Sequence, residues 1–175
     1  NIRDGFTKVM NQGIENMWAE KLGLKSYDAS LVNEMLQLMV LSKVDYTIFF
    51  RKLSNIPKKL TEIEQSFYQT SSEQIKNKWN SWLHRWREHI TNRGDQKVIS
   101  AKMKLINPKY TWREWLIAPA YEKAEQGDYS LIKELQIVLA NPYEEQSLEV
   151  EKKYDRLKPK ELFNIGGISH YSCSS

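Results

Sequence analysis

The sequence has one cysteine, five prolines and seven glycines in 175 residues. A single cysteine, Cys173, excludes an internal disulfide framework. No apolar run approaches the roughly 20 residues that a membrane-spanning helix needs, and the start has no basic segment followed by an apolar stretch that would indicate a secretory signal. The remaining composition, 41% hydrophobic and 27% charged, is that of an ordinary globular chain long enough for one packed core. Because the chain begins at Asn1 rather than Met, we interpret it as a piece of a longer protein.

Residues that carry chemistry are also scarce. The glycine pair at 166–167 lacks the spacing and the following lysine of a phosphate-binding loop. His84 and His89 lie about 140° apart around a helix axis, with no carboxylate at zinc-ligand spacing. His170 and Cys173 are three residues apart but lack further ligands or an orienting group. We therefore expect no catalytic residue, no cofactor site and no metal site in this chain.

Apolar residues recur at helical spacing along most of the chain, and no stretch alternates as a strand would. Asp28 or Ser30, Asp45 and Asp95 stand where helix N-caps are expected. The pattern predicts an all-α fold: a multi-helix bundle with a helical hairpin and an extended C-terminal tail. We divide the chain into a helical region, 1–158, and a tail, 159–175, that carries Cys173. The expected helices cover residues 6–22, 31–41, 46–53, 72–90, 95–106, 108–127 and 130–140. Residues 57–72 are expected to form a polar surface connection or one short helix, and disorder is expected there before anywhere else in the chain.

The first helix of the expected hairpin has clear start and stop signals. Asn107 is a good N-cap residue, Pro108 suits the first helical position, and Gly127 supplies a left-handed stop. Pro119 disagrees with this pattern, because a proline inside a helix removes a hydrogen bond at a cost of about 3 kcal/mol. We expect a kink or break near Ala118. The apolar face of this helix comprises Trp112, Leu116, Ala120 and Ala124.

The second helix of the hairpin follows after a very short turn. Asp128 or Ser130 is expected to cap it, and Asn141 with Pro142 to end it. Two amphipathic helices joined by so short a turn lie roughly antiparallel. The apolar stripe consists of Leu131, Leu135, Val138 and Leu139.

The strongest periodicity belongs to residues 72–90, where three tryptophans share one face with isoleucine and leucine. Basic residues lie between them, and residues 73–109 carry nine basic and three acidic side chains within a total net charge of +4. This arrangement favours core packing of the tryptophans with the basic residues on the wet side. The alternative is an independent all-α module that binds an acidic protein, or nucleic acid through a base-stacking platform. The apolar stripe consists of Ile75, Trp79, Trp82, Leu83, Trp86 and Ile90. The basic residues between them are Lys76, Lys78, Arg85 and Arg87.

Several short motifs are spread over most of the chain: Lys21 to Leu24; Asp45, Tyr46, Thr47, Phe49, Phe50, Arg51 and Leu53; Trp79, Trp82 and Arg87; Asn107 to Tyr110, Arg113 and Trp115; Gly127 and Asp128; and Asn141 to Tyr143. The ending, Ser172 to Ser175 with Cys173 inside it, completes the set. Each motif alone is weak, but the combination is specific. It resembles the C-terminal region of the SelO (YdiU) family, the pseudokinase-fold protein adenylyltransferases.

The resemblance implies a parent enzyme that moves AMP from ATP, with Mg²⁺ or Mn²⁺, onto hydroxyl side chains of protein substrates. Its kinase-like catalytic region would lie upstream, and the present chain would be a helical accessory region that packs on that region. The resemblance also implies a cytoplasmic location for a bacterial parent and a mitochondrial one for a eukaryotic parent. Membrane and nucleic-acid partners are not expected.

Cys173 is the one residue to which the resemblance assigns chemistry. The matching position is selenocysteine in animal members, and in cysteine-containing members it is thought to pair with a cysteine near the activation loop and make activity redox-sensitive. A thiol on the third residue from the end, on a polar tail, is accessible, and the chain's final carboxylate should raise the thiol's pKa. Position alone leaves redox pairing and a stray terminal cysteine equally open.

This sequence departs from the family pattern at two places. Pro159 to Phe163 stand where the family has a Pro-Pro-x-Trp step, and Pro119 replaces a residue that the family keeps helical. The path of the tail is therefore expected to differ.

Overall fold

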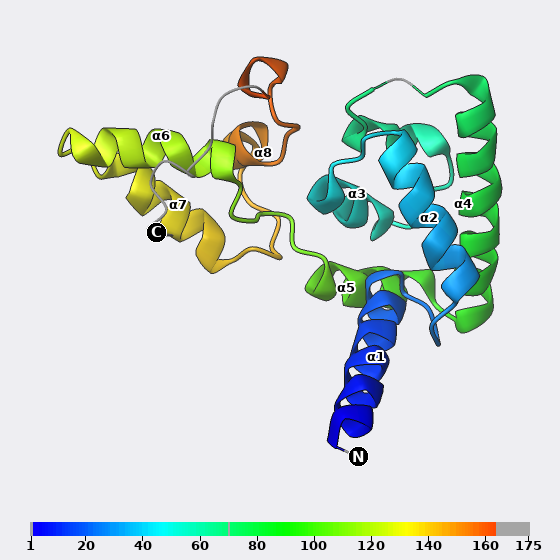
Figure 1. Ribbon diagram of the computed structural model, residues 1–175. Coiled ribbons are helices and arrows are strands. Elements are labelled where there is room, and N and C mark those ends of the chain that lie inside the picture. The colour runs from blue at the N-terminus through cyan, green and yellow to red at the C-terminus, as the bar shows by residue number, and fades with distance from the viewer. Residues whose placement is uncertain (1, 70, 164–175) are drawn as a thin grey trace. The chain divides into compact units, whose positions relative to one another are not determined.

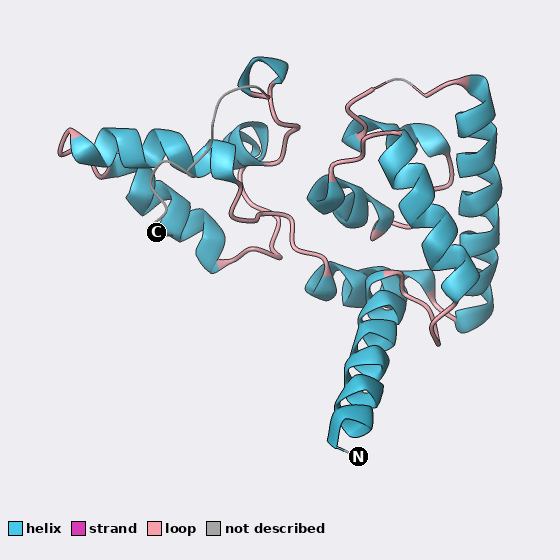
Figure 2. Ribbon diagram, in the orientation of Figure 1, coloured by secondary structure: helices cyan, strands magenta, loops and turns pink. Residues whose placement is uncertain are grey.

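A computed structural model describes residues 2–69 and 71–163 (Figure 1). The backbone in these ranges forms helices and loops, with one isolated antiparallel bridge between Val44 and Phe67, which confirms the all-α prediction (Figure 2). The α-helices are α1 (Ile2–Lys21), α2 (Ala29–Leu41), α3 (Tyr46–Leu53), α4 (Glu73–Arg93), α5 (Gln96–Ile106), α6 (Glu114–Glu125), α7 (Ser130–Ala140) and α8 (Leu148–Tyr154), and three 3₁₀ turns are η1 (Leu60–Glu62), η2 (Glu64–Ser66) and η3 (Lys160–Leu162).

The chain divides into two compact units, Asn1–Asn107 and Pro108–Ser175. The expected hairpin therefore belongs to a unit of its own, which the sequence did not indicate. The boundary predicted at residue 158 stays a prediction, although the turn η3 lies just beyond it in the segment expected to be extended. Among the described residues, no helix combines the length and the apolar composition needed to cross a bilayer.

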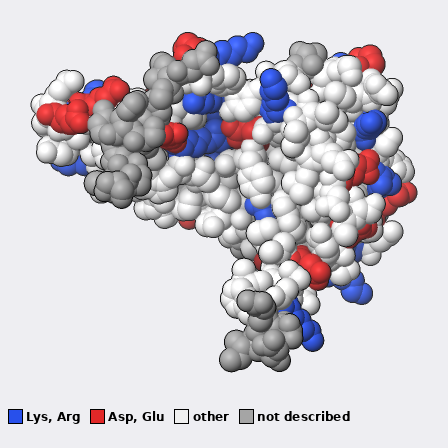
Figure 3. Space-filling view, in the orientation of Figure 1, with Lys and Arg blue, Asp and Glu red and all other residues white. Residues whose placement is uncertain are grey.

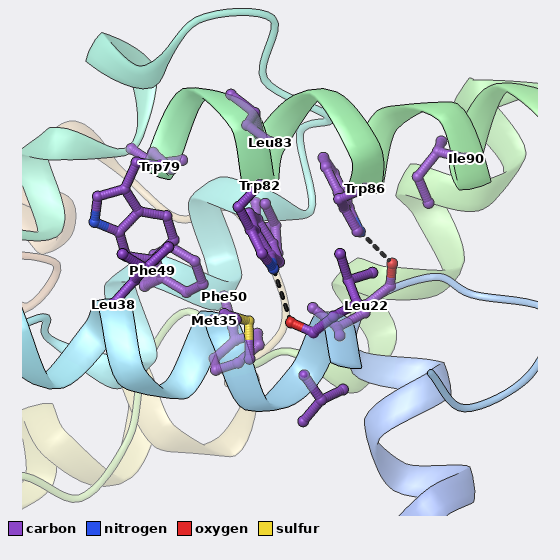
Figure 4. Packing of buried hydrophobic residues seen from close by; sticks show 14 of the residues in the cluster. Leu22, Met35, Leu38, Phe49, Phe50, Trp79, Trp82, Leu83, Trp86 and Ile90 are labelled. Carbon is purple, nitrogen blue, oxygen red and sulfur yellow. Dashed lines mark hydrogen bonds between the residues drawn. The ribbon is translucent and has the colours of Figure 1, made fainter. Parts of the chain in front are cut away.

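The first unit is organised around α4, whose tryptophan stripe lies against α2 and α3 (Figure 4). Trp79, Trp82 and Trp86 are fully buried, and the rings of Trp82 and Trp86 stack with centroids 6.0 Å apart. Each indole N–H has a partner, because Trp79 donates to the Ser42 hydroxyl, Trp82 to the Leu31 carbonyl and Trp86 to the Leu22 carbonyl, at 2.8–2.9 Å. The prediction that these tryptophans face the core is confirmed.

Helix ends in the first unit follow the local signals. The side chains of Asp28, Asp45 and Asp95 accept hydrogen bonds from the first turns of α2, α3 and α5, as predicted. Gly23 ends α1 with φ +66°, and a Cβ there would lie 2.6 Å from the Met103 sulfur. Glycine is therefore required at this position both for the left-handed backbone and for the close approach of α5.

The connection between α3 and α4 is more ordered than its polar sequence suggested. It contains η1 and η2, and Leu60, Ile63 and Phe67 from it are buried in the core of the first unit. Three apolar anchors spaced three or four residues apart were too few to stand out in a segment rich in lysine, glutamate and serine.

The second unit contains the expected hairpin, α6 and α7, with α8. Gly127 adopts φ +84° and ends α6, as predicted. Asp128 accepts a hydrogen bond from the Ser130 N–H at 2.9 Å. Hydrogen bonds from the Ser130 hydroxyl and the Ser130 N–H, together with Lys123, lower the pKa of Asp128 to about 2. The small core comprises Tyr110, Ala120, Leu135, Val138 and Tyr154.

The predicted start of the hairpin was wrong. Its first helix begins at Glu114, not at Pro108, because the N–H groups of Lys109 and Tyr110 both donate to the Pro142 carbonyl and hold that segment extended. Trp112 consequently lies outside the helix and is 65% exposed. Of the kink or break expected near Ala118, the break is absent, because α6 continues through Pro119 to Glu125, and the kink stays a prediction.

Candidate functional site

Four polar side chains meet in the interior of the first unit, and we call them the polar junction: Lys21, Arg51, Ser54 and Asn107. The Lys21 Nζ donates to the Asn107 Oδ1 at 2.8 Å, and the Asn107 Nδ2 donates to the Lys21 carbonyl at 2.9 Å and to the Ser54 hydroxyl at 3.0 Å. Arg51 donates to the carbonyls of Lys104 and Asn107 at 3.0 and 3.2 Å. The junction therefore links the ends of α1, α3 and α5.

All four residues of the polar junction are buried, and Ser54 and Asn107 are completely so. The Lys21 ammonium lies over the rings of Phe50 and Tyr46, 4.5 and 5.1 Å from their centroids. Burial lowers the pKa of Lys21, since its charged form loses water contacts. The Lys21 ammonium contacts an amide oxygen and two aromatic rings, and these contacts stabilise the packing of the helices. Because Lys21 is buried, a large substrate cannot reach its ammonium.

Asn107 has a different role from the one predicted. It ends α5, and its own N–H donates to the Met103 carbonyl at 2.8 Å. Its side chain hydrogen-bonds to Lys21 and Ser54, which lie 86 and 53 positions earlier in the sequence. Local sequence rules identify asparagine before proline as a helix start, but the tertiary partners determine its role here.

A second polar cluster lies in the second unit, and we call it the lysine cage: Lys109, Glu145, Glu151 and Asp155. Lys109 is only 6% exposed, and its Nζ makes hydrogen-bonded ion pairs with Glu145 and Glu151 and lies 3.9 Å from Asp155. Burial alone would lower the pKa of Lys109, but the hydrogen bonds to Glu145 and Glu151 outweigh it, so the pKa is raised. The cage connects two parts of the second unit. The extended segment that precedes α6 supplies Lys109, and α8 and the loop between α7 and α8 supply Glu151 and Glu145.

The hydroxyl of Tyr110 lies beside the lysine cage. It is buried without a hydrogen-bond partner among the described residues, and burial raises its pKa. Burying an unpaired hydroxyl destabilises the folded state, so the ring, not the hydroxyl, provides the stabilising contact at this position.

Three basic residues of the middle segment are engaged by partners within the first unit. Arg85 pairs with Glu34, Arg87 donates to the carbonyls of Ile56 and Pro57, and Arg93 donates to the Gly23 carbonyl. With the tryptophans fully buried, no aromatic face of this stripe is open for base stacking. Basic and acidic residues also alternate along the α4 side of the face shown in Figure 3.

The histidines of α4 lie apart, since His84 is 3.8 Å from Glu88 and His89 is 3.7 Å from Asp28. Within the described ranges, 2–69 and 71–163, no three histidine, cysteine or acidic side chains are grouped so that they could hold a metal ion. The described residues therefore offer no ligand set for the divalent cation that the resemblance implies. Cys173, the predicted redox residue, and His170 lie outside the described residues.

The two clusters coincide with the motifs noted in the sequence, since Lys21, Arg51, Asn107 and Lys109 all belong to them. A comparison with known protein families bears on the same residues, because the profile of the family described as protein adenylyltransferase SelO matches residues 3–140. The chain belongs to the SelO family. The resemblance inferred from the motifs is thereby confirmed.

Individual relatives agree with the SelO assignment. The chain is 31% identical to the protein nucleotidyltransferase YdiU of Aromatoleum aromaticum, in an alignment covering 98% of this chain and 34% of the relative. It is 30% identical to the YdiU protein of Flavobacterium johnsoniae, over 100% of this chain and 37% of that protein, and 32% identical to that of Tolumonas auensis, over 97% and 34%. The chain thus spans about a third of the length of these curated relatives.

The motifs noted in the sequence include Lys21, Asn107 and Lys109 but not the side chains that these residues contact. Ser54, Glu145 and Glu151 carry no local signal, because each meets its lysine or asparagine partner across 36 to 53 positions of sequence. In the structure, the motif residues Lys21, Arg51, Asn107 and Lys109 make packing and hydrogen-bonding contacts within the helical region.

Proposed function

We propose that this chain is the helical, non-catalytic part of a protein adenylyltransferase. The parent enzyme transfers AMP from ATP to hydroxyl side chains of proteins, with Mg²⁺ or Mn²⁺, and its kinase-like catalytic region lies in the longer parent outside these 175 residues. The observation that carries this proposal is the match of the SelO family over residues 3–140 in a chain that spans only about a third of its relatives.

Within that enzyme the helical region acts as a scaffold. Four of the motif residues make hydrogen bonds or ion pairs in the two clusters: Lys21, Arg51 and Asn107 in the polar junction and Lys109 in the lysine cage. Because these contacts hold helix ends together, they favour a structural role for the four residues. The proposed partners are the parent's own catalytic region and its protein substrates. A cytoplasmic location for a bacterial parent, or a mitochondrial one for a eukaryotic parent, stays a prediction from the resemblance.

The transfer reaction tests the proposal directly. The full-length parent, incubated with ATP labelled on the α-phosphate, Mg²⁺ and a protein acceptor, should transfer the label to the acceptor, and label on the γ-phosphate should not appear there. Parent protein that transfers neither label, or only the γ-phosphate, would refute adenylyl transfer.

We also propose that Cys173 forms a regulatory disulfide with a second cysteine in the parent, supported by the family resemblance of the Ser-Cys-Ser-Ser ending. In this step each thiol loses a proton and an electron, the sulfurs join, and hydrogen peroxide accepts both electrons and both protons to give water. Cys173→Ser in the parent should remove the difference in transfer rate between peroxide-treated and reduced enzyme, whereas Ser172→Ala should keep it. An undiminished difference in the Cys173→Ser enzyme would reject this regulation.

A further inference from the structure

Helix α1 has an apolar face that the described chain leaves uncovered. Its N-terminal part extends away from the other helices of the first unit (Figure 1). The side chains on this face are 40–71% exposed, although their spacing is that of a buried helix face. We call this set the α1 stripe: Phe6, Val9, Met10, Ile14 and Met17.

The opposite face of α1 is polar, so the helix is amphipathic. It carries Lys8, Asn11 and Glu15, with one basic and one acidic residue among them. A helix that lies on an anionic membrane surface has a basic polar face, and this one does not. Isolated exposed apolar residues are normal on proteins, but five on one helix face mark a contact surface.

A glycine at the centre of the α1 stripe points to the kind of contact. At 100° per residue, Gly13 lies about 20° from Phe6 and about 40° from Met17 around the helix axis. Glycine within a helix is disfavoured about fivefold relative to alanine. Nothing lies within 4 Å of a Cβ built at Gly13, so the chain's own packing does not require glycine there. A partner whose atoms approach the helix backbone would require it.

We propose that the α1 stripe is the surface on which the catalytic region of the parent polypeptide docks, with the backbone of α1 approached most closely at Gly13. This inference rests on the proposed function. The occupant follows from chain length, because about two-thirds of each relative lies outside the match to this chain and offers a partner that is always present at high local concentration. A second copy of the chain would have to compete with that covalently linked partner.

Amide hydrogen exchange of α1 tests the docking in the full-length parent and in the 175-residue chain. Amides 9–17 should exchange at least tenfold more slowly in the parent, because docking suppresses the local opening of α1. Equal exchange in the two proteins would overturn the proposal.

Two helix-favouring substitutions sharpen this test. Gly13→Ala should slow exchange of α1 about fivefold in the 175-residue chain, where the added methyl meets nothing, and should speed it at least tenfold in the parent, where the methyl obstructs docking. Asn11→Ala, on the polar face, should slow exchange in both proteins. If Gly13→Ala also slowed exchange in the parent, close approach at Gly13 would be ruled out.

A charge placed on the stripe provides a second variant that does not depend on glycine. Ile14→Asp should speed α1 exchange in the parent at least tenfold relative to Asn11→Asp, while the two variants should exchange alike in the 175-residue chain. Sedimentation of the 175-residue chain should show a monomer at micromolar concentration, and a dimer that Ile14→Asp dissociates would assign the stripe to a second copy and reject our occupant.

The docking and the proposed function fail in different ways. A parent that transfers AMP but leaves α1 as fast-exchanging as in the 175-residue chain rejects the docking alone. A parent that protects α1 but transfers no AMP rejects adenylyl transfer, and the docking of α1 on the rest of the polypeptide is then supported.

Discussion

Replacing Asn107 by alanine should lower the free energy of unfolding of the first unit by about 3–5 kcal/mol. The change removes one hydrogen-bond acceptor and two donated hydrogen bonds from the polar junction. It leaves the buried ammonium of Lys21 without its amide oxygen, and burying a charge without a hydrogen-bond partner is the larger part of the loss.

Urea unfolding followed by tryptophan fluorescence measures this effect, because the three tryptophans of α4 are fully buried in the same unit. Asn92→Ala is the matched control, since Asn92 is exposed near the end of α4 and its change should stay within about 0.5 kcal/mol. An Asn107→Ala loss as small as that of the control would show that the polar junction does not hold the helices together.

Replacing Lys109 by methionine should destabilise the second unit by about 2 kcal/mol at pH 7, because Glu145 and Glu151 then face each other without the cation. We expect less than for a fully buried ion pair, since Glu145 is 56% exposed and water can still reach it. Hydrogen exchange of α6, α7 and α8 measures the loss, and Lys133→Met on the exposed side of α7 is the matched control.

The lysine cage also fixes how stability depends on pH. The pKa of Lys109 is raised in the folded state above its usual value of 10.5. The stabilisation is therefore complete below pH 10.5 and is lost as the pH rises through the folded-state pKa, where the ammonium loses its proton. This alkaline loss should be absent in Lys109→Met, which has no ammonium at this position to lose a proton. A variant with the same alkaline profile as wild type would contradict the cage.

The parts of the fold that could be predicted are those with local causes. The stripe of α4 repeats every three or four residues with large side chains, and Asp28, Asp45 and Asp95 cap helices through their own next turns. Each of these signals depends only on neighbours in sequence, and no tertiary contact changes the local structure that it predicts.

The parts that could not be predicted depend on distant partners. Asn107 and Pro108 are residue types typical of a helix start. The N–H groups of Lys109 and Tyr110, however, donate to the Pro142 carbonyl, and α6 begins only at Glu114. The acidic partners of Lys109 come from 36 to 46 residues downstream. The periodicity of residues 6–22 correctly predicted a helix, α1, but a pattern within one helix does not say what covers its apolar face.

We propose that this helical region supports a reaction centre located elsewhere in the parent SelO family protein. Calorimetric titration with ATP and Mg²⁺, performed on the 175-residue chain and on the full-length parent, tests it most directly. We predict that the parent binds the nucleotide and that the 175-residue chain gives no binding heat. Saturable binding of ATP by the 175-residue chain alone would contradict the account.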